Sequence, residues 1–312
     1  MTTPKPPRPA PRPTRHDPAP VHGAVVPPAP SSVDLHAHTT RSDGIVPPAA
    51  LVRQAFEAGV RTFALTDHDT LAGYREVMAA DAVPAGLRLL PGVEINALVT
   101  RDLGLWEGEL HILGFGMDPN DEAFEAQLAA QRGRRRERFT RTVTKLRNAG
   151  MPIDDQVVGL VSTDDDAMGR PTIARALIAA GHATSVEDAF RRLIGHGGPG
   201  YVPREGLGPT EAIQAVTAAG GVPVLAHFSE APTRRELLQE LIEEGLVGLE
   251  VYYRSFDIDT VAAVGAVARD LGLLPTGGTD YHGDLGPYAE AHGLLWVPPE
   301  IGESLLERIA RA

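Results

Sequence analysis

The 312-residue chain contains no cysteine. This absence excludes disulfide bonds and thiolate metal sites, so histidine, aspartate and glutamate must provide the ligands of any metal ion. It is also compatible with a reducing compartment, and we expect a cytoplasmic protein. Aromatic residues make up only 5% of the chain. The core must therefore consist mainly of alanine, valine, leucine and isoleucine, which suits an α/β fold.

The chain also lacks long apolar segments and an excess of positive charge. No apolar run is long enough to cross a membrane, and the N-terminus lacks the apolar segment of a secretory signal peptide. The formal net charge is −12. Such a charge opposes the phosphate contacts on which stable DNA binding depends, but it is compatible with a small nucleotide as partner. Nothing in the sequence indicates an oligomeric state.

Proline and basic residues dominate the first 30 positions, which contain almost nothing to bury. We predict a disordered tail there. From Val33 onward, short apolar strands alternate with amphipathic helices, a pattern that implies a parallel sheet or barrel. The predicted strands span residues 33–38, 61–66, 92–100, 109–115, 222–227, 246–253 and 273–278.

The alternation is interrupted in the middle of the chain. Residues 120–150 read as one long helix with an apolar stripe, and two shorter helices follow at 171–181 and 185–195. We therefore predict that residues 31–117 and 201–312 form one α/β barrel. Residues 118–200 would form a helical insertion that covers the substrate.

Most of the eleven histidines lie on or directly after predicted strands, and carboxylates accompany them. Alternate side chains of a strand share a face, so the two histidines of the segment VDLHAH project together if it is extended. The carboxyl ends of parallel strands converge on one face, where ligands bind. We therefore expect one rim to carry nine candidate ligands: His36, His38, Asp43, Glu94, His68, His111, His227, Asp280 and His282.

Nine such residues exceed the four ligands of a closed structural zinc site. Imidazole nitrogens combined with carboxylate oxygens suit Zn, Mn or Fe rather than Mg or Ca alone. The sequence thus predicts at least two divalent ions, with Glu94 or Asp280 as a candidate bridge between them.

Several motifs follow one another along the chain: DLHAHTTRSDG, ALTDHDT, PGVEI, HILGF, AH after a Val-rich strand, and GTDYHGD. In this order they resemble the PHP (polymerase and histidinol phosphatase) superfamily. GRP followed by YVPREGLGPTEAI resembles its branch of nucleotide phosphatases and 5′–3′ exoribonucleases. The resemblance covers residues 33 to about 297, and it implies a distorted (β/α)7 barrel with a helical insertion and a trinuclear metal centre.

The resemblance also implies how the candidate ligands divide among two or three divalent ions (Mn, Zn or Fe), and which residues are catalytic: Asp280, Glu94 and His227. The first ion would be held by His36, His38, Glu94 and Asp280, the second by Glu94, His111 and His227, and the third by Asp43, His68 and His282. Two positions depart from the family pattern. Thr172 follows GRP where relatives often have histidine, and Phe228 replaces the usual proline after AH.

Such a centre implies a phosphoesterase in which metal-activated hydroxide attacks phosphorus. The expected substrate is a nucleoside monophosphate, a 3′,5′-bisphosphate or the 5′ end of a short RNA. A sugar phosphate, cyclic phosphate or histidinol phosphate is the nearer alternative, because pocket residues decide specificity. An amidohydrolase is disfavoured, since its barrel usually needs a bridging lysine and none occurs between Lys5 and Lys145. The complete ligand set disfavours a non-catalytic scaffold.

Two arginines are candidates for binding the substrate phosphate. Arg170 precedes Pro171 at the expected start of a helix, and a helix N-terminus with a guanidinium group attracts anions. Arg204 lies in the segment YVPREG. For either residue, the alternative interpretation is an ordinary surface arginine.

Other charged residues of these motifs are interpreted as structural. The run of arginines from Arg132 to Arg141 predicts a solvated helix face rather than an RNA-binding surface. Asp69 is interpreted as a helix N-cap, whereas Asp67 is expected to orient a ligand histidine.

Overall fold

The computed structural model describes residues 31–99, 109–158, 169–283 and 286–312. Seven strands form one sheet in which neighbours follow the chain order. Their bounds are β1 Val33–Asp34, β2 Thr62–Leu65, β3 Arg88–Leu98, β4 Glu109–Phe115, β5 Val222–Leu225, β6 Gly248–Tyr253 and β7 Leu274–Gly278. The segment after β1 also lies beside β7, because Leu35 donates a backbone hydrogen bond to Gly277 (3.0 Å) and Asp280 donates one to His36 (2.7 Å). The predicted distorted barrel of seven strands is confirmed.

One strand runs against the expected parallel order. β4 is antiparallel to both β3 and β5, whereas the other pairs are parallel. The segment between Leu98 and Glu109 is shorter than the crossover connection that a parallel pair needs, which agrees with the antiparallel pairing of β3 and β4. As a consequence, the beginning of β4 lies at the rim where the other strands end.

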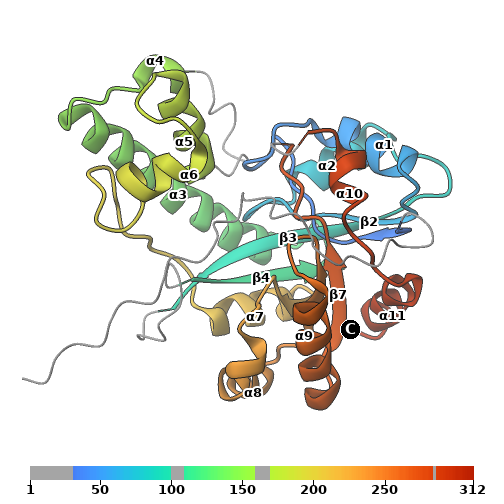
Figure 1. Ribbon diagram of the computed structural model, residues 1–312. Helices are drawn as coiled ribbons and strands as arrows, with labels where there is room; N and C mark the ends of the chain where they lie inside the picture. The colour runs from blue at the N-terminus through green and yellow to red at the C-terminus, as the bar shows by residue number, and fades with distance from the viewer. Residues whose placement is uncertain (1–30, 100–108, 159–168, 284–285) are drawn as a thin grey trace, which may run out of the picture.

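Helices cover the outside of the barrel (Figure 1). Three of them begin with proline in the first turn, where its missing N–H is no loss. The bounds are α1 Pro48–Glu57, α2 Ala72–Ala79, α7 Pro209–Ala218, α8 Arg235–Glu243, α9 Ile258–Leu271, α10 Tyr288–His292 and α11 Pro299–Ile309, with a short 3-10 helix η2 at Ala231–Thr233. Among the described residues, no helix combines the length and apolar character needed to span a bilayer.

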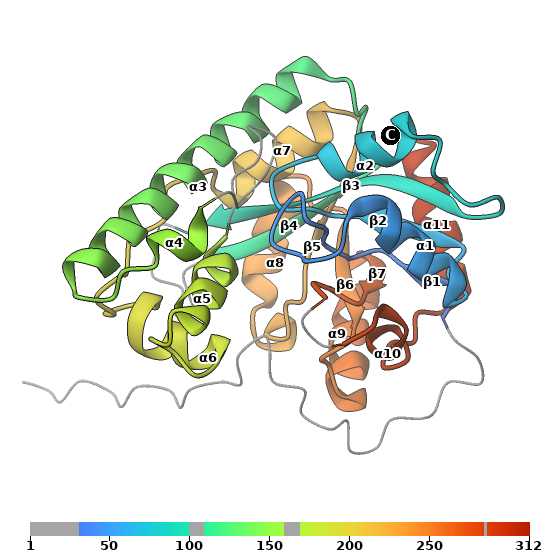
Figure 2. The same ribbon diagram turned by 90° about the horizontal axis from the view of Figure 1, so that it is seen from above.

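A second group of helices lies between β4 and α7 in the chain and stands to one side of the barrel (Figures 1 and 2). It consists of α3 Glu122–Asn148, α4 Asp154–Val157, α5 Arg170–Ala179, α6 Val186–Ala189 and the π-helix η1 Phe190–Ile194. We call these elements the helical insertion.

The long helix α3 belongs to both parts of the molecule. Near its start, Phe124 and Leu128 pack in the same buried cluster as barrel residues such as Ile95. Near its end, Phe139 and Leu146 pack in a separate cluster that is formed by the insertion itself. One continuous helix therefore connects the barrel core to the core of the insertion.

Candidate metal centre

The structure brings all nine candidate ligands together at one rim of the barrel. Those from β1, β2, β5 and β7 lie just beyond the strand ends, and Asp43 comes from the loop after β1. Glu94 lies within β3, and His111 is the third residue of the antiparallel β4. The reversal of β4 thus places His111 beside residues that follow the ends of parallel strands. The ligand atoms form three overlapping groups, each with its atoms within 4.8 Å of one another.

The first group consists of His36, His38, Glu94 and Asp280. His38 Nε2 lies 3.1 Å from both Glu94 Oε2 and Asp280 Oδ1. His36 Nε2 lies 3.4 and 3.3 Å from the same two oxygens. Two imidazoles and two carboxylates therefore face one small volume.

The second group shares Glu94 with the first but uses its other oxygen. Glu94 Oε1 contacts His111 Nδ1 and lies 3.1 Å from His227 Nε2. Because Oε2 belongs to the first group and Oε1 to the second, Glu94 is the residue that these two groups share. The family resemblance implied the same division, with Glu94 in both of these groups.

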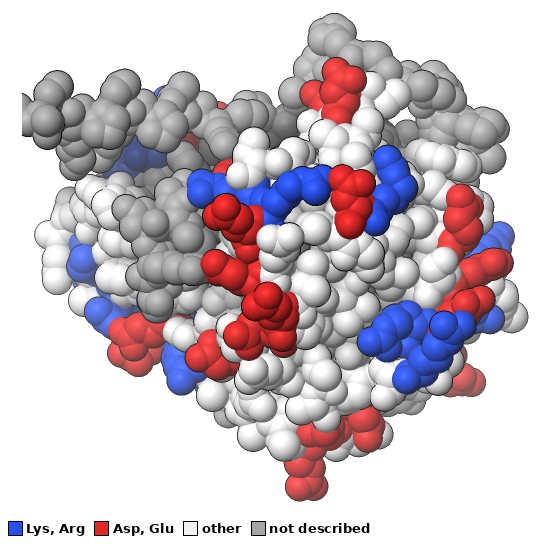
Figure 3. All heavy atoms as spheres, turned by 90° about the horizontal axis from the view of Figure 1, so that it is seen from below, with Lys and Arg blue, Asp and Glu red and all other residues white. Residues whose placement is uncertain are grey.

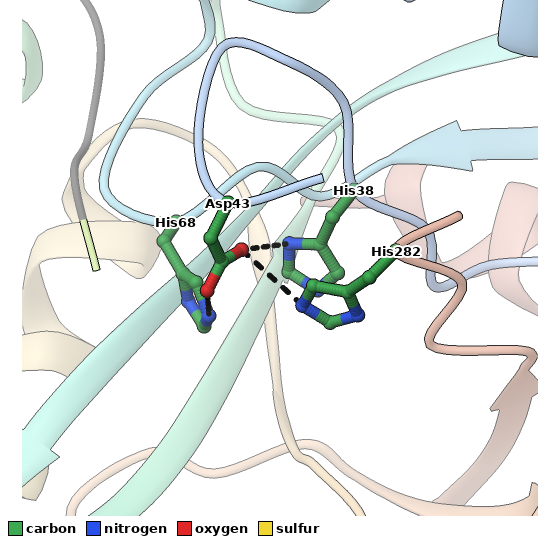
Figure 4. A group of neighbouring side chains, drawn as sticks. All are labelled: His38, Asp43, His68 and His282. Atoms are coloured by element: carbon green, nitrogen blue, oxygen red, sulfur yellow. Dashed lines mark ion pairs between the residues drawn. The ribbon is translucent and has the colours of Figure 1, made fainter. Parts of the chain in front are cut away.

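In the third group, Asp43 lies between three imidazoles (Figure 4). Its carboxylate is 3.2 Å from His282 Nε2, 3.5 Å from His68 Nε2 and 3.9 Å from His38 Nδ1. His38 was expected in the first group alone, and the structure places it in both. Its two ring nitrogens face different groups.

Buried polar atoms without hydrogen bonds test whether these residues suit metal ions. Within the described part of the chain, six such atoms point into the three groups: His36 Nε2, His38 Nε2, Asp43 Oδ1, His68 Nδ1, Glu94 Oε2 and Asp280 Oδ1. Leaving buried polar atoms unpaired is costly, and cations at the three positions would satisfy them. Imidazole and carboxylate donors suit Zn, Mn and Fe. The residues therefore fit divalent metal ions.

Electrostatics support the same interpretation. Burial alone would lower the pKa of His38, but contacts with Asp280 and Glu94 raise it to about 10. Burial would raise the pKa of Asp280, yet the neighbouring imidazoles hold it well below its usual range. Burial lowers the pKa of His68 well below its ordinary value, which keeps that imidazole neutral and able to coordinate. The carboxylates thus demand positive charge, which protons or metal ions can supply.

Further residues, not predicted from the sequence, hold the ligands in place. Glu250 of β6 is fully buried, and its Oε1 lies 3.0 Å from His36 Nδ1 while its Oε2 accepts a hydrogen bond from the backbone of His227 (2.7 Å). Tyr253 donates a hydrogen bond to Asp280 Oδ2 (2.9 Å). Such outer contacts orient metal ligands and tune their basicity. The acidic residue within the otherwise apolar segment GLEVYY was the available signal for Glu250.

The two predicted phosphate-binding arginines meet at one carboxylate. Arg170 Nη2 lies 3.7 Å from Glu109 Oε1, and Arg204 Nη1 contacts Glu109 Oε2. Arg138 of α3, which was not predicted as a site residue, joins this arginine cluster and donates to the backbone oxygen of Val202 (2.9 Å). Burial and the neighbouring Arg170 and Arg204 lower the pKa of Arg138 to about 9. Two guanidinium groups that share one carboxylate, with a third nearby, leave an excess of positive charge.

The arginine cluster adjoins the metal-ligand rim. Glu109 Oε2 lies 3.8 Å from Nε2 of His111, which presents its other nitrogen to Glu94. An anion held by the arginines would therefore be close to the second group of ligands.

Some structural predictions were wrong. Arg132 and Arg135 are only 3% and 8% exposed, so the arginine run of α3 is not uniformly a solvated face. Asp69 does not cap α2, which begins at Ala72; its side chain instead accepts a hydrogen bond from Arg135. Asp67 accepts hydrogen bonds from Thr39 and Ser42 and so holds the loop between His38 and Asp43, while its expected role in orienting a ligand histidine stays a prediction.

Two curated proteins resemble this chain over most of its length. A curated 5′–3′ exoribonuclease of Haemophilus influenzae is 32% identical over 80% of this chain and 89% of its own length. A 3′,5′-nucleoside bisphosphate phosphatase of Chromobacterium violaceum is 30% identical over 81% of this chain and 87% of its own.

Two solved structures share the fold. One, from Bifidobacterium adolescentis and assigned as a metal-dependent phosphoesterase, has a TM-score of 0.75 and 34% identity, covering 88% of this chain and 95% of its own. Another, from Chromobacterium violaceum, is titled an amidohydrolase with bound sulfate and no metal; its TM-score is 0.77 at 27% identity, over 90% of this chain and 96% of its own. The PHP domain model matches residues 34–219. The chain therefore belongs to the PHP domain family.

Proposed function

We propose that this protein is a metal-dependent phosphoesterase that hydrolyses phosphate esters of nucleotides. The substrates we expect are nucleoside monophosphates, 3′,5′-bisphosphates and the 5′ end of short RNA. The observation that carries the proposal is the position of a cluster of arginines beside three overlapping groups of histidines and carboxylates. The names of the relatives in Haemophilus influenzae and Chromobacterium violaceum support this substrate class.

The nine rim residues would hold two or three ions of Mn, Zn or Fe. We assign His36, His38, Glu94 and Asp280 to the first ion, Glu94, His111 and His227 to the second, and Asp43, His68 and His282 with His38 to the third. When bound, such ions polarise phosphoryl oxygens and lower the pKa of a water molecule, which supplies the nucleophile.

The three residues that we expect to be catalytic hold this arrangement together. Glu94 would contribute to both the first and the second ion, because each of its oxygens faces one of the two groups. Asp280 presents Oδ1 to His36 and His38 while Tyr253 donates to its other oxygen. His227 completes the second position, and its backbone is held by Glu250.

We assign substrate binding to Arg170 and Arg204, with Arg138 beside them. Their mutual repulsion is relieved when a dianionic phosphate enters, and charge-assisted contacts to phosphate are among the stronger hydrogen bonds. Arg170 is also the first residue of α5, whose N-terminus favours an anion. The helical insertion, which supplies Arg138 and Arg170, would cover the substrate at the rim of the barrel.

The distribution of surface charge favours a small substrate over a long duplex. On the face shown in Figure 3, basic side chains gather in small groups beside acidic ones rather than in a continuous stripe. Stable DNA binding depends on many phosphate contacts at once. This face therefore offers little support for duplex DNA as a partner.

A cyclic phosphate diester is the second candidate substrate. A relative in Eggerthella lenta, named phosphoribosyl 1,2-cyclic phosphate 1,2-diphosphodiesterase, is 28% identical over 81% of this chain. The same ligand set can serve either reaction, because the pocket residues select the substrate. The amidohydrolase reading is less favoured, since no lysine occurs between Lys5 and Lys145.

Phosphate release by the Mn-loaded protein tests the proposal. We expect turnover of nucleoside monophosphates, 3′,5′-bisphosphates or 5′-phosphorylated short RNA, and none after chelation. Ribose cyclic phosphates and histidinol phosphate should be assayed in parallel. No hydrolysis of any nucleotide, with turnover of a cyclic or sugar phosphate, would reject the nucleotide assignment while keeping the phosphoesterase.

A further inference from the structure

Helix α3 carries two buried arginines whose side chains contact residues next to the metal-ligand rim. Arg132 and Arg135 lie midway along the helix, between the part that packs on the barrel and the part that packs in the insertion. Both side chains are almost fully buried, at 3% and 8% exposed. Burying a guanidinium group is costly unless charged or polar partners surround it. The partners of these two arginines therefore indicate what they do.

Both arginines hold Asp69, which directly follows the candidate ligand His68. Arg135 Nε donates to Asp69 Oδ2, and Arg132 Nη1 donates to the backbone oxygen of Asp69 (3.0 Å). Asp69 has a φ of 51°, which is unfavourable for a residue other than glycine. The backbone N–H of Asp69 donates a hydrogen bond to the backbone oxygen of Glu94 (3.0 Å), so the strained turn is also connected to the rim.

Arg135 also reaches the second group of ligands through Asn96. Its Nη2 donates to Asn96 Oδ1, and the amide nitrogen of Asn96 contacts Nε2 of His111. Asn96 and His111 are direct partners in the pairing of β3 with β4, so this contact crosses between adjacent strands. Nδ1 of the same imidazole faces Glu94. The outer side of His111 is therefore held by a residue that Arg135 holds in turn.

We propose that Arg135 is a positioning residue for the metal centre, acting on His68 through Asp69 and on His111 through Asn96. This inference rests on the proposed function, because it assumes that these histidines bind metal. It gives the helical insertion a second role besides covering the substrate. Removing the guanidinium group would leave the Asp69 carboxylate buried without its cation, and both the strained turn and Asn96 would lose support.

Binding of Co²⁺ to chelated protein tests this role without any substrate. We expect Arg135→Gln and Asn96→Ala each to weaken Co²⁺ binding about 10- to 100-fold, the usual effect of removing an outer contact of a metal ligand. The visible spectrum of bound Co²⁺ should change as well, because ligand geometry determines it. Arg134→Gln, at an exposed position of the same helix, is the matched control and should leave affinity and spectrum unchanged.

The double variant decides whether the two residues act in one chain of contacts. If Arg135 acts on His111 through Asn96, the double variant should bind Co²⁺ little more weakly than the weaker of the two single variants. If the losses of Co²⁺ affinity in the two single variants multiply in the double variant, Arg135 does not act through Asn96. Should Arg135→Gln fail to fold, Arg135→Lys, which keeps the charge but not the two-pronged contact, takes its place with the same expectation.

Other outcomes would also overturn the proposal. If Arg135→Gln lowers thermal stability while Co²⁺ affinity and spectrum stay unchanged, the residue is merely structural. If Co²⁺ binding is unchanged and only the KM rises, Arg135 contacts substrate instead. If the unaltered protein binds no Co²⁺ at all, both the proposed function and this inference are rejected. The outcomes above reject only the role of Arg135, so the two kinds of failure can be told apart.

Discussion

The metal-ligand rim and the arginine cluster are adjacent, yet they are built differently. Rim residues sit on barrel strands or within a few residues of their ends, apart from Asp43, which lies in the loop after β1. The arginines come from α3, from the start of α5 and from the segment before α7, all within or next to the helical insertion. A strand end has a defined position in a barrel, whereas an arginine on an inserted helix is placed only by packing. The rim is therefore the more predictable of the two regions.

The two regions also differ in charge. At the rim, carboxylates and imidazoles compensate one another and leave atoms that a cation would satisfy. In the arginine cluster, Arg170 and Arg204 share Glu109 while Arg138 lies nearby, which leaves an excess of positive charge. The first region suits metal ions and the second an anion. A phosphate ester suits both regions, because its anionic oxygens can contact metal ions as well as arginines. The following variants alter one region at a time.

Asp280→Asn should have the largest effect, on the rim alone. It removes a negative charge that faces two imidazoles while preserving the shape of the side chain. We expect kcat to fall at least about 10²- to 10³-fold, as when one group of a preorganised charge-stabilising site is removed. Circular dichroism should show a retained fold. Unchanged turnover would refute the catalytic assignment of Asp280.

Glu250→Gln should weaken the rim indirectly. The change removes the charge beside His36 Nδ1 but keeps an oxygen that can accept a hydrogen bond. We expect metal affinity to fall about 10- to 100-fold, measured by Mn²⁺ titration of chelated protein. Glu236→Gln, an exposed residue of α8, is the control. Equal affinity in both variants would show that Glu250 serves folding alone.

Arg204→Met should affect the arginine cluster and leave the rim intact. Loss of one charged hydrogen bond to phosphate, about 1.5–3 kcal/mol, corresponds to a rise in KM of about 10- to 100-fold. Arg170→Met should behave similarly, whereas Arg191→Met, which is 69% exposed, should not. Initial rates at saturating Mn²⁺ measure this. A fall in metal affinity in the Arg204 variant would mean that the two regions are not separable.

The smallest expected effect is a dependence of thermal stability on pH. It should appear in chelated protein and disappear when metal is bound. The pKa values of His36 and His38 are raised in the folded protein, that of His38 to about 10. A histidine whose pKa is raised by folding contributes its full stabilisation of the folded state below the pKa of the unfolded chain, about 6.5. This stabilisation is lost as the pH rises toward about 10. The Tm of chelated protein should therefore fall across this range.

Metal-loaded protein should not show the same loss, because bound ions replace the protons and bind more tightly as the pH rises. Thermal melts in EDTA and in Mn²⁺ at several pH values compare the two forms. Parallel curves would contradict the view that protons and metal ions compete for the rim.

The histidines and acids of the rim could be predicted from their positions in the chain. His36, His68 and Asp280 follow apolar strand segments, and strand ends of an α/β fold converge for reasons of topology. The position of His111 at the rim was expected for an incomplete reason. It lies near the start of a strand, and only the antiparallel course of β4 places it at the rim.

Residues whose roles depend on distant partners could not be predicted in the same way. Arg135 was interpreted as part of a solvated face, because the residues near it in the sequence do not indicate that it contacts Asp69 and Asn96. Glu250 lies in a strand segment that reads as apolar, and its partner His36 is more than two hundred positions away.

The chain's local patterns were thus sufficient for the barrel and for a set of candidate ligands that meet at its rim. The membership of His38 in two groups, the antiparallel course of β4 and the contacts of α3 were decided by tertiary packing. The physical reason is that periodicity and strand ends are properties of short segments. A hydrogen bond such as that from Arg135 to Asn96 exists only once the long helix has packed against the barrel.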